Sequence, residues 1–408
     1  MLNVPHSAFS PAFPSTILAV FNFLLASPAP RRSALHHNIM PKRVCQHCGH
    51  PFAIPDAMIG ENVSCPSCGK SLLQPRSPRA AVEKIKLTVT APPLDIYPAA
   101  KLASIAQAII DNVQRVIVGK PEQVTLAVAT LFAEGHLLLE DVPGVAKTML
   151  SRAIAQSVGC TFKRIQCTPD LDPAHVIGDF TTDLATGKKD FRFGPIFSQM
   201  VLVDEINRAS PRTQSALLEA MGEGSVTMDR VTYRLEKPFM VMATQNPIDQ
   251  EGTFRLPEAQ MDRFLIRLSL GYPDEAQERE MCTRIRQQHP IDDLQPVTTG
   301  DVIIKCQRGV REIAVSAEVC NHLIALTRAT RTHPALRLGA SPRGSLGLYH
   351  AAQALAAMRG EPAVTIEHIN TFAVPVLAHR LIVRREALKD YPDPAAVIRE
   401  IVGRSAAL

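Results

Sequence analysis

The sequence predicts an α/β fold with a parallel sheet, followed by a helical domain and preceded by a small cysteine-rich module. Three observations predict this arrangement. Short apolar runs at residues 136–139, 200–203 and 239–243 alternate with segments of helical apolar spacing, which is typical of repeated strand–helix units. From residue 275 onward the spacing is mostly helical. Four cysteines occur as two close pairs between residues 45 and 68.

The composition limits the number of domains and the kinds of partner. The chain has 408 residues, of which 46% are hydrophobic, enough for two or three domains with a sizeable core. The formal net charge is +5. Residues 1–100 hold nine Lys and Arg against four Asp and Glu, and the rest of the chain is balanced at 35 of each. The large part of the chain is therefore not a basic body built to bind nucleic acid.

The first 39 residues predict a separate leader. Residues 17–26 form an apolar run of ten, which is too short to span a bilayer. No Lys or Arg precedes this run, whereas a secretory signal needs a positive segment there. Met40 opens the sequence M-P-K-R-V-C and could serve as the start. We expect a disordered leader or a mis-set start and a cytoplasmic location, with an export signal as the less favoured alternative.

Cys45, Cys48, Cys65 and Cys68 have the spacing C-x₂-C-x₁₆-C-x₂-C, which is the spacing of a zinc ribbon. Each C-x-x-C can turn two thiolates toward one ion, and the two pairs complete a closed tetrahedral site. The metal would replace the core that residues 40–70 are too few to build. Two disulfides, which need an oxidising compartment, or a redox pair are the alternatives. We expect the other cysteines to be buried thiols: Cys160, Cys167, Cys282, Cys306 and Cys320.

Residues 140–148 read E-D-V-P-G-V-A-K-T, close to the phosphate-binding pattern G-x-x-x-x-G-K-[ST]. The two glycine slots of that pattern fall on Asp141 and Ala146, whereas Lys147 and Thr148 match it. An apolar run precedes the loop and helical spacing follows it, and a helix N-terminus after a strand offers free N–H groups to phosphate. Lys147 would contact the β- and γ-phosphates and the Thr148 hydroxyl would bind Mg²⁺. An ordinary strand–turn–helix is the alternative.

Asp204 and Glu205 follow the apolar run at residues 200–203. Because parallel sheets bind ligands at the carboxyl ends of their strands, we expect both carboxylates beside the phosphate loop. Asp204 would hold Mg²⁺ and Glu205 would orient the attacking water. A solvated acidic strand end is the alternative. Asn246 follows the run at residues 239–243 and would hold the same water without adding charge.

Arg263 lies in the segment L-P-E-A-Q-M-D-R-F at residues 256–264. Its guanidinium could stabilise the phosphate that is transferred in a neighbouring subunit. Such a role in trans requires the chains to assemble. A weak ion pair with Asp262 at a helix end is the alternative.

These segments together resemble the MoxR family of AAA+ ATPases. The similar stretches cover most of residues 100–385, and several are much longer than a generic motif. A further stretch, G-A-S-P-R, resembles the start of the sensor-2 helix of that family. The stretches are R-I-Q-C-T-P-D-L at 164–171, F-R-F-G-P-I-F at 191–197, V-D-E-I-N-R-A at 203–209, T-Q-S-A-L-L-E-A-M at 213–221, A-T-Q-N-P-I-D-Q-E-G-T at 243–253, L-P-E-A-Q-M-D-R-F at 256–264 and G-A-S-P-R at 339–343.

The resemblance implies an AAA+ P-loop core over residues 99–273 with a helical lid over residues 274–408, joined to the cysteine module by a linker at residues 71–98. It implies ATP and Mg²⁺ as ligands and assembly into a homo-oligomeric ring, often a hexamer. It also implies a role for each matching position. These are Walker A at Pro143, Gly144, Val145, Ala146, Lys147, Thr148 and Met149, Walker B at Asp204 and Glu205, sensor 1 at Asn246, the arginine finger at Arg263, sensor 2 at Arg343, and an adenine contact at Val118 and Gly119.

Insertions and helices complete the predicted domain. Residues 170–197 and 226–235 are expected as inserted loops, the second a β-hairpin. The resemblance implies that such loops face a pore or a substrate, and surface decoration is the alternative. Residues 344–358 carry helical spacing, and we expect Leu346, Tyr349 and Leu355 in the packing core of that helix.

The resemblance implies ATP hydrolysis by a chaperone-like remodelling factor with von Willebrand factor A-domain partners. Two alternatives stay open: a nucleic-acid motor, since the N-terminal module is basic, and a scaffold that binds ATP with little turnover. Glu205, Asn246 and Arg263 argue against the scaffold. Similar loops in the family also carry Ala before the Lys and a residue other than Gly at the first slot, so Ala146 and Asp141 fit the family. These two residues leave the rate of ATP hydrolysis and the affinity for ATP open.

Overall fold

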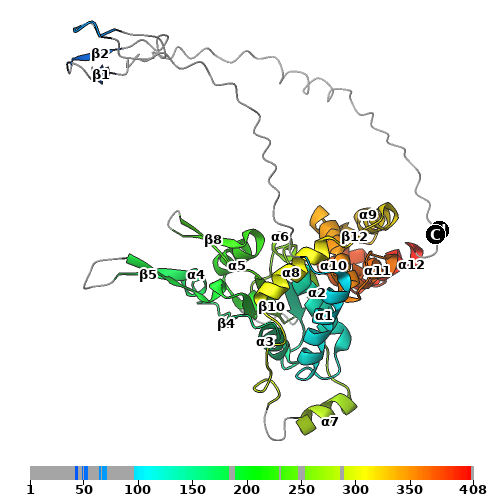
Figure 1. The fold of residues 1–408 in the computed structure, drawn as a ribbon. Helices are drawn as coiled ribbons and strands as arrows, with labels where there is room; N and C mark the ends of the chain where they lie inside the picture. The colour runs from blue at the N-terminus through cyan, green and yellow to red at the C-terminus, as the bar shows by residue number, and fades with distance from the viewer. Residues whose placement is uncertain are drawn as a thin grey trace, which may run out of the picture. The chain divides into compact units, whose positions relative to one another are not determined.

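The computed structural model divides into two compact units, residues 1–91 and 92–408 (Figure 1). Each unit is described by itself. In the small unit, β1 (Lys42–Val44) pairs antiparallel with β2 (Pro51–Ala53). The predicted leader and residues 71–95 of the predicted linker lie outside the described residues. The structure describes residues 42–44, 48, 50–53, 64–65, 67–70, 96–182, 189–228, 231–246, 253–284 and 289–405.

A five-stranded parallel sheet forms the centre of the large unit, with the strand order β11-β3-β10-β7-β4. The predicted parallel sheet is therefore confirmed. The three central strands are almost wholly buried, as expected for parallel strands covered on both faces. The strands are β3 (Leu137–Glu140), β4 (Phe162–Gln166), β7 (Met200–Asp204), β10 (Met240–Gln245) and β11 (Ile266–Leu268).

Alternate residues of the strands pack into two separate hydrophobic cores, one on each face of the sheet. Leu137, Leu202 and Met242 belong to one core, whereas Leu138 and Val203 belong to the other. This alternation follows from the two-residue period of a strand. The first core contains residues of α1 (Ala99–Gln114), α2 (Pro121–Phe132) and α3 (Lys147–Ser157), and the second contains residues of α4 (Pro173–Ile177) and α5 (Pro211–Glu223).

Two antiparallel hairpins form the predicted insertions. The first is β5 (Gly178–Thr182) with β6 (Lys189–Phe193), and the second is β8 (Ser225–Met228) with β9 (Val231–Arg234). The rings of Phe191 and Tyr233 stack with centroids 4.9 Å apart and so join the two hairpins. A short helix, η2 (Pro195–Phe197), returns the chain to β7.

The C-terminal part is mostly helical, and α10 packs against α1 and α2 of the sheet domain (Figure 1). The predicted lid is thus confirmed as a helical domain. Within the described part of the chain, no helix is long and apolar enough to cross a membrane. The elements are α6 (Glu258–Met261), α7 (Glu275–Arg284), α8 (Gly300–Arg311), α9 (Ala317–Thr332), β12 (Leu336–Leu338), α10 (Pro342–Met358), α11 (Ile366–Leu377), η4 (Ala378–Arg380), β13 (Ile382–Val383), η5 (Arg385–Ala387) and α12 (Pro394–Ser405).

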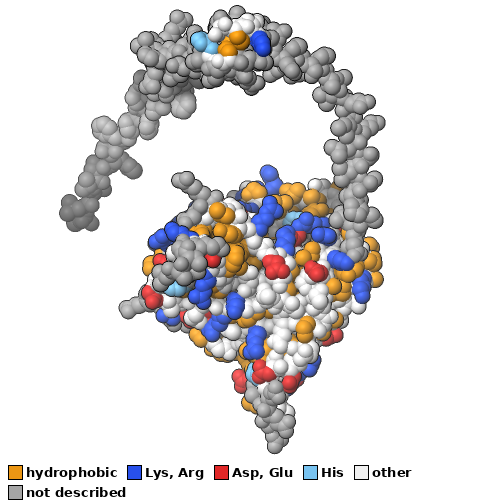
Figure 2. All heavy atoms as spheres, turned by 60° about the vertical axis from the view of Figure 1, so that its left-hand side comes forward, with side chains coloured by type: hydrophobic (Ala, Val, Ile, Leu, Met, Phe, Trp, Pro, Cys, Tyr) orange, Lys and Arg blue, Asp and Glu red, His pale blue; other side chains and the backbone are white. Residues whose placement is uncertain are grey.

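Two predictions of burial are wrong, and two are met only in part, because Cys160 and Cys320 are half-buried. Leu346 is 60% exposed, because it lies on the outward face of α10, whereas the alanines of this helix and Leu355 face the core. Cys282 is exposed, because α7 buries no residue. Side chains of both charge signs are spread over the face of the molecule in Figure 2, in keeping with the balanced charge of residues 101–408.

Candidate active site

The phosphate-loop segment lies between the end of β3 at Glu140 and the start of α3 at Lys147. Gly144 has φ +87°, and a Cβ there would meet nothing within 4 Å. Ala146 caps α3 with φ 60° and ψ 22°, the left-handed region in which a side chain is unfavourable by about 1–2 kcal/mol. The second glycine slot therefore has the backbone conformation of a glycine but carries a methyl group.

Asp141, at the first glycine slot, is a buried anchor. Its Oδ2 accepts hydrogen bonds from the backbone N–H groups of Leu270 at 2.6 Å and Gly271 at 2.7 Å, and from the Ser269 hydroxyl at 3.1 Å. Its Oδ1 accepts from the N–H of Val142 at 2.9 Å. This role was not predicted from the sequence, because the position was compared only with glycine.

Lys147 is held inside the loop by carbonyl oxygens. Its Nζ donates to the backbone oxygens of Asp141 at 2.6 Å and Val142 at 3.2 Å. Partial burial lowers the pKa of Lys147, and the negative charges of Asp141, Asp204 and Glu205 oppose that shift. A phosphate oxygen could replace these carbonyl contacts at little cost, because the ammonium already points into the loop.

The predicted phosphate, metal and water ligands line one cavity of about 340 Å³. The strands β3, β7 and β10 are parallel neighbours, so their carboxyl ends bring these residues to the same edge of the sheet. The lining residues are Pro143, Gly144, Ala146, Lys147, Thr148, Met149, Asp204, Glu205, Thr244 and Asn246.

Thr244 joins β7 and β10, two of the strands that end in this cavity. Its hydroxyl donates to Asp204 Oδ1 at 2.6 Å and accepts from the backbone N–H of Glu205 at 2.8 Å. Glu205 has φ 56° and ψ 52°, an uncommon conformation for a non-glycine residue and one that clusters at functional sites. Thr244 was not identified from the sequence, although it lies two residues before Asn246.

Arginines flank both carboxylates. Arg164 on β4 donates from Nε to Asp204 Oδ2 at 3.0 Å and from a second nitrogen at 2.5 Å. Arg208 donates to Glu205 Oε2 at 3.0 Å. Neither arginine was identified from the sequence, although each lies within a stretch that carried the resemblance. Both guanidinium groups are about half exposed, so water or a cation can replace them.

A second, smaller cavity of about 70 Å³ adjoins the first. The two cavities share Gly144 and Ala146. The segment before α2 closes the cavity against the segment after β11, because Lys120 Nζ donates to the Tyr272 carbonyl at 3.0 Å and the Gly119 carbonyl accepts from Gln277 at 3.3 Å. The lining is mainly apolar: Val116, Ile117, Val118, Lys120, Gly144, Val145, Ala146, Leu270, Gly271, Pro273 and Met281.

Arg263 and Arg343 line neither of these two cavities. Arg263 donates to the carbonyl oxygen of Leu218 on α5, and a Cβ at Gly222 would lie 2.3 Å from the Arg263 guanidinium. Arg343 lies in the first turn of α10. The structure thus brings together nine predicted residues around the phosphate loop, all of the lining residues except Thr244, and leaves these two arginines outside it.

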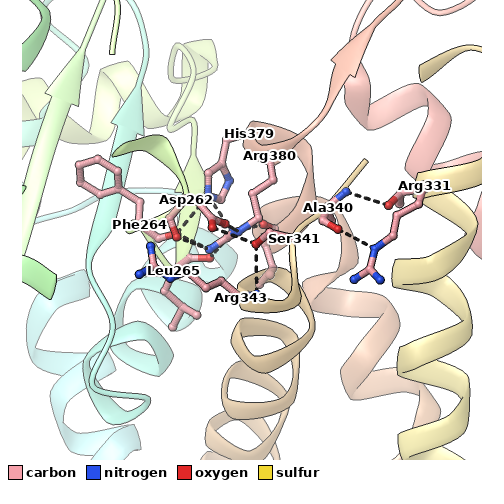
Figure 3. Close-up of polar contacts among 11 residues, drawn as sticks. Asp262, Phe264, Leu265, Arg331, Ala340, Ser341, Arg343, His379 and Arg380 are labelled. Atoms are coloured by element: carbon pink, nitrogen blue, oxygen red, sulfur yellow. Dashed lines mark hydrogen bonds and ion pairs between the residues drawn. The ribbon is translucent and has the colours of Figure 1, made fainter. Parts of the chain in front are cut away.

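A polar junction joins the segment of Arg263 to the start of α10 (Figure 3). Asp262 pairs with Arg380 Nε at 2.8 Å and accepts from the Ser341 hydroxyl at 2.8 Å. The same Ser341 oxygen caps α10 by accepting from the N–H of Arg343 at 3.1 Å. In this structure Asp262 thus pairs with Arg380 and not with Arg263, which bonds to Leu218 instead.

In the small unit, the sulfur atoms of Cys48, Cys65 and Cys68 lie within 4.8 Å of one another. The sulfurs of Cys48 and Cys65 are 3.7 Å apart, well beyond the length of a disulfide bond. Three thiols at this spacing fit the ligand set of a tetrahedral zinc ion. Cys45 lies outside the described residues.

Comparisons with known proteins agree over most of the large unit. The family described as "ATPase family associated with various cellular activities (AAA)" matches residues 136–266, and the one described as "AAA lid domain" matches residues 328–401. The chain is 46% identical to "Uncharacterized protein YeaC" of Bacillus subtilis, over 72% of this chain and 92% of that protein. It is 40% identical to "Chaperone MoxR1" of Mycobacterium tuberculosis, over 74% of this chain and 82% of that protein.

A solved structure gives the same result for the fold. The crystal structure described as that of "a putative ATPase from Cytophaga hutchinsonii" superposes with a TM-score of 0.70 at 34% sequence identity. The match covers 74% of this chain and 95% of that chain.

Proposed function

The chain belongs to the MoxR family of AAA+ ATPases, and from this premise we propose that it hydrolyses ATP to ADP and phosphate with Mg²⁺. The observation that carries the proposal is the single cavity lined by Lys147, Thr148, Asp204, Glu205 and Asn246. Phosphoryl transfer needs positioning and charge neutralisation more than covalent chemistry. An ammonium, a hydroxyl, two carboxylates and an amide on one cavity supply both.

The donor set fits Mg²⁺, which takes oxygen ligands and commonly binds through few carboxylates and the substrate phosphates. We propose that the Thr148 hydroxyl and the Asp204 carboxylate hold the ion. When bound, Mg²⁺ neutralises negative charge on the phosphates. Lys147 would bind the β- and γ-phosphates, Glu205 would orient the attacking water, and Asn246 would hold that water.

The small apolar cavity supports a site for the adenine base. Val118 lines it and Gly119 lies beside it. Because this cavity shares Gly144 and Ala146 with the larger one, one nucleotide could occupy both, with its phosphates around the loop and its base against Val118.

We propose a homo-oligomeric ring, a hexamer, in which Arg263 completes the site of the neighbouring subunit. The support is that Arg263 does not line the cavity of its own chain. Arg343 would contribute from the first turn of α10. A relative named as a chaperone supports a remodelling activity on partner proteins, and we extend it to a partner with a von Willebrand factor A domain and a cytoplasmic location.

The test of the ATPase proposal is Glu205→Gln in the full chain. This variant should bind ATP as the wild type does and lose turnover by about 10²-fold or more, because the attacking water loses its orienting carboxylate. Glu318→Gln is the matched control. Glu318 is exposed on α9, and its substitution makes the same carboxylate-to-amide change away from the cavity. Equal, slow hydrolysis by wild type and Glu205→Gln would contradict the proposal and favour the ATP-binding scaffold.

We also propose that Cys45, Cys48, Cys65 and Cys68 bind one structural Zn²⁺. The cluster of three sulfurs supports it. The full chain purified under reducing conditions should hold one zinc ion, and Cys68→Ser should lose most of it. Cys282→Ser, at an exposed cysteine on α7, should keep the full amount. A zinc-free wild-type chain would remove the proposal.

A further inference from the structure

We propose that Asp141 is a positioning residue that fixes the wall of the base cavity to the phosphate loop, and so sets the affinity for the nucleoside part of ATP. This inference rests on the proposed function, because it concerns how the same site holds its substrate. It gives a purpose to the residue that occupies the first glycine slot of the phosphate-loop pattern.

Hydrogen bonds link the Asp141 side chain to the wall of the base cavity. Oδ2 of Asp141 accepts from three donors in residues 269–271, the segment that directly follows β11. Two of those donor residues, Leu270 and Gly271, also line the base cavity. One carboxylate at the start of the phosphate loop therefore holds two adjacent residues of the cavity wall, at positions about 130 residues later in the chain.

The backbone conformation of that wall depends on the bond to Asp141. Gly271 has φ +63°, and a Cβ there would meet nothing within 4 Å. Glycine is the least constrained residue of the backbone, so packing alone does not fix this position. The 2.7 Å bond from the Gly271 N–H to Asp141 fixes it instead.

The Asp141 carboxylate is buried and therefore needs these hydrogen bonds. Asp141 is only 7% exposed, and a buried carboxylate is stable only when donors satisfy it. The hydrogen bonds from Val142 and from residues 269–271 do so. A glycine at this position would leave the N–H groups of Leu270 and Gly271 without this acceptor, and an unmatched buried donor is unfavourable.

The main chain of Asp141 makes separate contacts to the phosphate end of the site. Its carbonyl accepts from Lys147 Nζ at 2.6 Å, and its N–H donates to the carbonyl of Gln245, the residue before Asn246, at 3.2 Å. These backbone contacts are available to any residue except proline at position 141. A substitution of Asp141 therefore keeps them while it breaks the bonds to the base wall, and the loss of its negative charge near Lys147 does not weaken the attraction of phosphate.

Ala146 supplies the opposite case within the same loop. It occupies the second glycine slot with φ 60°, where glycine is favoured and alanine is strained. Restoring the glycine pattern at the two slots should therefore have opposite consequences. Ala146→Gly removes strain, whereas Asp141→Gly removes an anchor.

The experiment measures the binding of Mg²⁺-ATP and of Mg²⁺-tripolyphosphate to the full chain by calorimetry. Asp141→Gly should weaken ATP binding about ten-fold or more, whereas tripolyphosphate, which lacks the base, should bind no more than about two-fold less tightly than to the wild type. Asp141→Asn keeps one acceptor oxygen and should fall between wild type and Asp141→Gly. Ala146→Gly should bind both ligands at least as tightly as wild type.

Three outcomes would overturn the inference. The first is ATP affinity unchanged in both Asp141 variants. The second is an equal loss of affinity for ATP and tripolyphosphate, which would show a general structural defect; Asp141→Asn provides this test if Asp141→Gly does not fold. The third is a wild-type chain that binds no ATP, and only that outcome would also overturn the proposed function.

Discussion

The carboxyl ends and the amino ends of the central strands carry charged groups in contrasting environments. We call these the carboxyl edge and the amino edge of the sheet. At the carboxyl edge, the partners of Asp204 and Glu205 are the half-exposed guanidinium groups of Arg164 and Arg208. At the amino edge, the side chain of Arg380 is only 4% exposed. It donates to the carbonyls of the two residues that precede β11, Phe264 at 2.7 Å and Leu265 at 3.2 Å, and pairs with Asp262.

The amino edge also holds two buried histidines. Nε2 of His379 lies 3.1 Å from the Phe264 carbonyl oxygen and 2.8 Å from a guanidinium nitrogen of Arg380. His136, just before β3, accepts at Nδ1 from the N–H of Val241 at 3.0 Å and contacts the Met221 carbonyl through Nε2 at 3.0 Å. Burial lowers the pKa of both rings, so both stay neutral at pH 7.

The difference follows from what each edge has to do. Ligands reach a parallel sheet at its carboxyl edge, and charges there need partners that a phosphate or a metal ion can displace. The amino edge joins the sheet to η4 and to α10 (Figure 3), and its polar groups are bonded in one fixed arrangement. Exposed ion pairs contribute little to stability, whereas breaking a buried pair costs several kcal/mol.

Arg380→Met tests the contrast with the largest expected effect. Removing the guanidinium leaves Asp262 without its charged partner and takes one donor from each of the carbonyls of Phe264 and Leu265. We expect the free energy of unfolding to fall by about 3–5 kcal/mol, measured by urea denaturation at pH 7.

Arg359→Met is the matched control for this prediction. Arg359 pairs with Glu367 at 3.0 Å on the surface, and its loss should change the free energy of unfolding by less than about 1 kcal/mol. Similar losses in the two variants would show that the amino edge is no more tightly bonded than the surface.

Much of the carboxyl edge could be predicted from the sequence. The runs at residues 136–139, 200–203 and 239–243 match β3, β7 and β10 to within one or two residues, because buried parallel strands are short and continuously apolar. Once the strands are parallel neighbours, the residues that follow them must meet at one edge. Lys147, Asp204 and Asn246 lie together for that reason.

The amino edge and the anchor role of Asp141 could not be predicted in this way. Asp141 bonds to residues 269–271, and Asp262 bonds to Arg380, so each pair joins distant parts of the chain with no local pattern. Burial within a helix was also misjudged at Leu346, because apolar spacing shows a stripe but not what covers it.

His136 gives the next largest effect, through pH. Burial lowers its pKa from 6.5 to about 4 in the folded chain. A histidine with a lowered folded pKa stabilises the fold fully above pH 6.5 and loses that contribution as the pH falls toward 4, because the unfolded chain takes up the proton first. The free energy of unfolding should drop by about 3 kcal/mol from this residue between pH 7 and pH 4.

The comparison that isolates this contribution is between the wild type and His136→Gln, which does not titrate. Both proteins are unfolded with urea at pH 7, 5.5 and 4. His379 also has a lowered pKa and changes the stability of both proteins in the same direction. The wild type should therefore lose about 3 kcal/mol more than the variant over this range. Parallel curves for the two proteins would contradict the prediction.

Arg164→Met gives the smallest effect and tests whether the charges of the carboxyl edge are exchangeable. The guanidinium contacts the same Asp204 carboxylate that we propose for Mg²⁺, so the ion and Arg164 compete for it. Because the Arg164 guanidinium is half exposed, loss of the ion pair with Asp204 should change the free energy of Mg²⁺-ATP binding by about 1 kcal/mol at most. Mg²⁺-ATP should then bind up to about five-fold more tightly to the variant, as measured by calorimetry across a series of Mg²⁺ concentrations.

Arg164→Lys keeps the charge and should stay close to wild type. If Arg164→Met instead weakens binding, Arg164 belongs to the fixed structure of the site, and the two edges differ less than their exposure indicates.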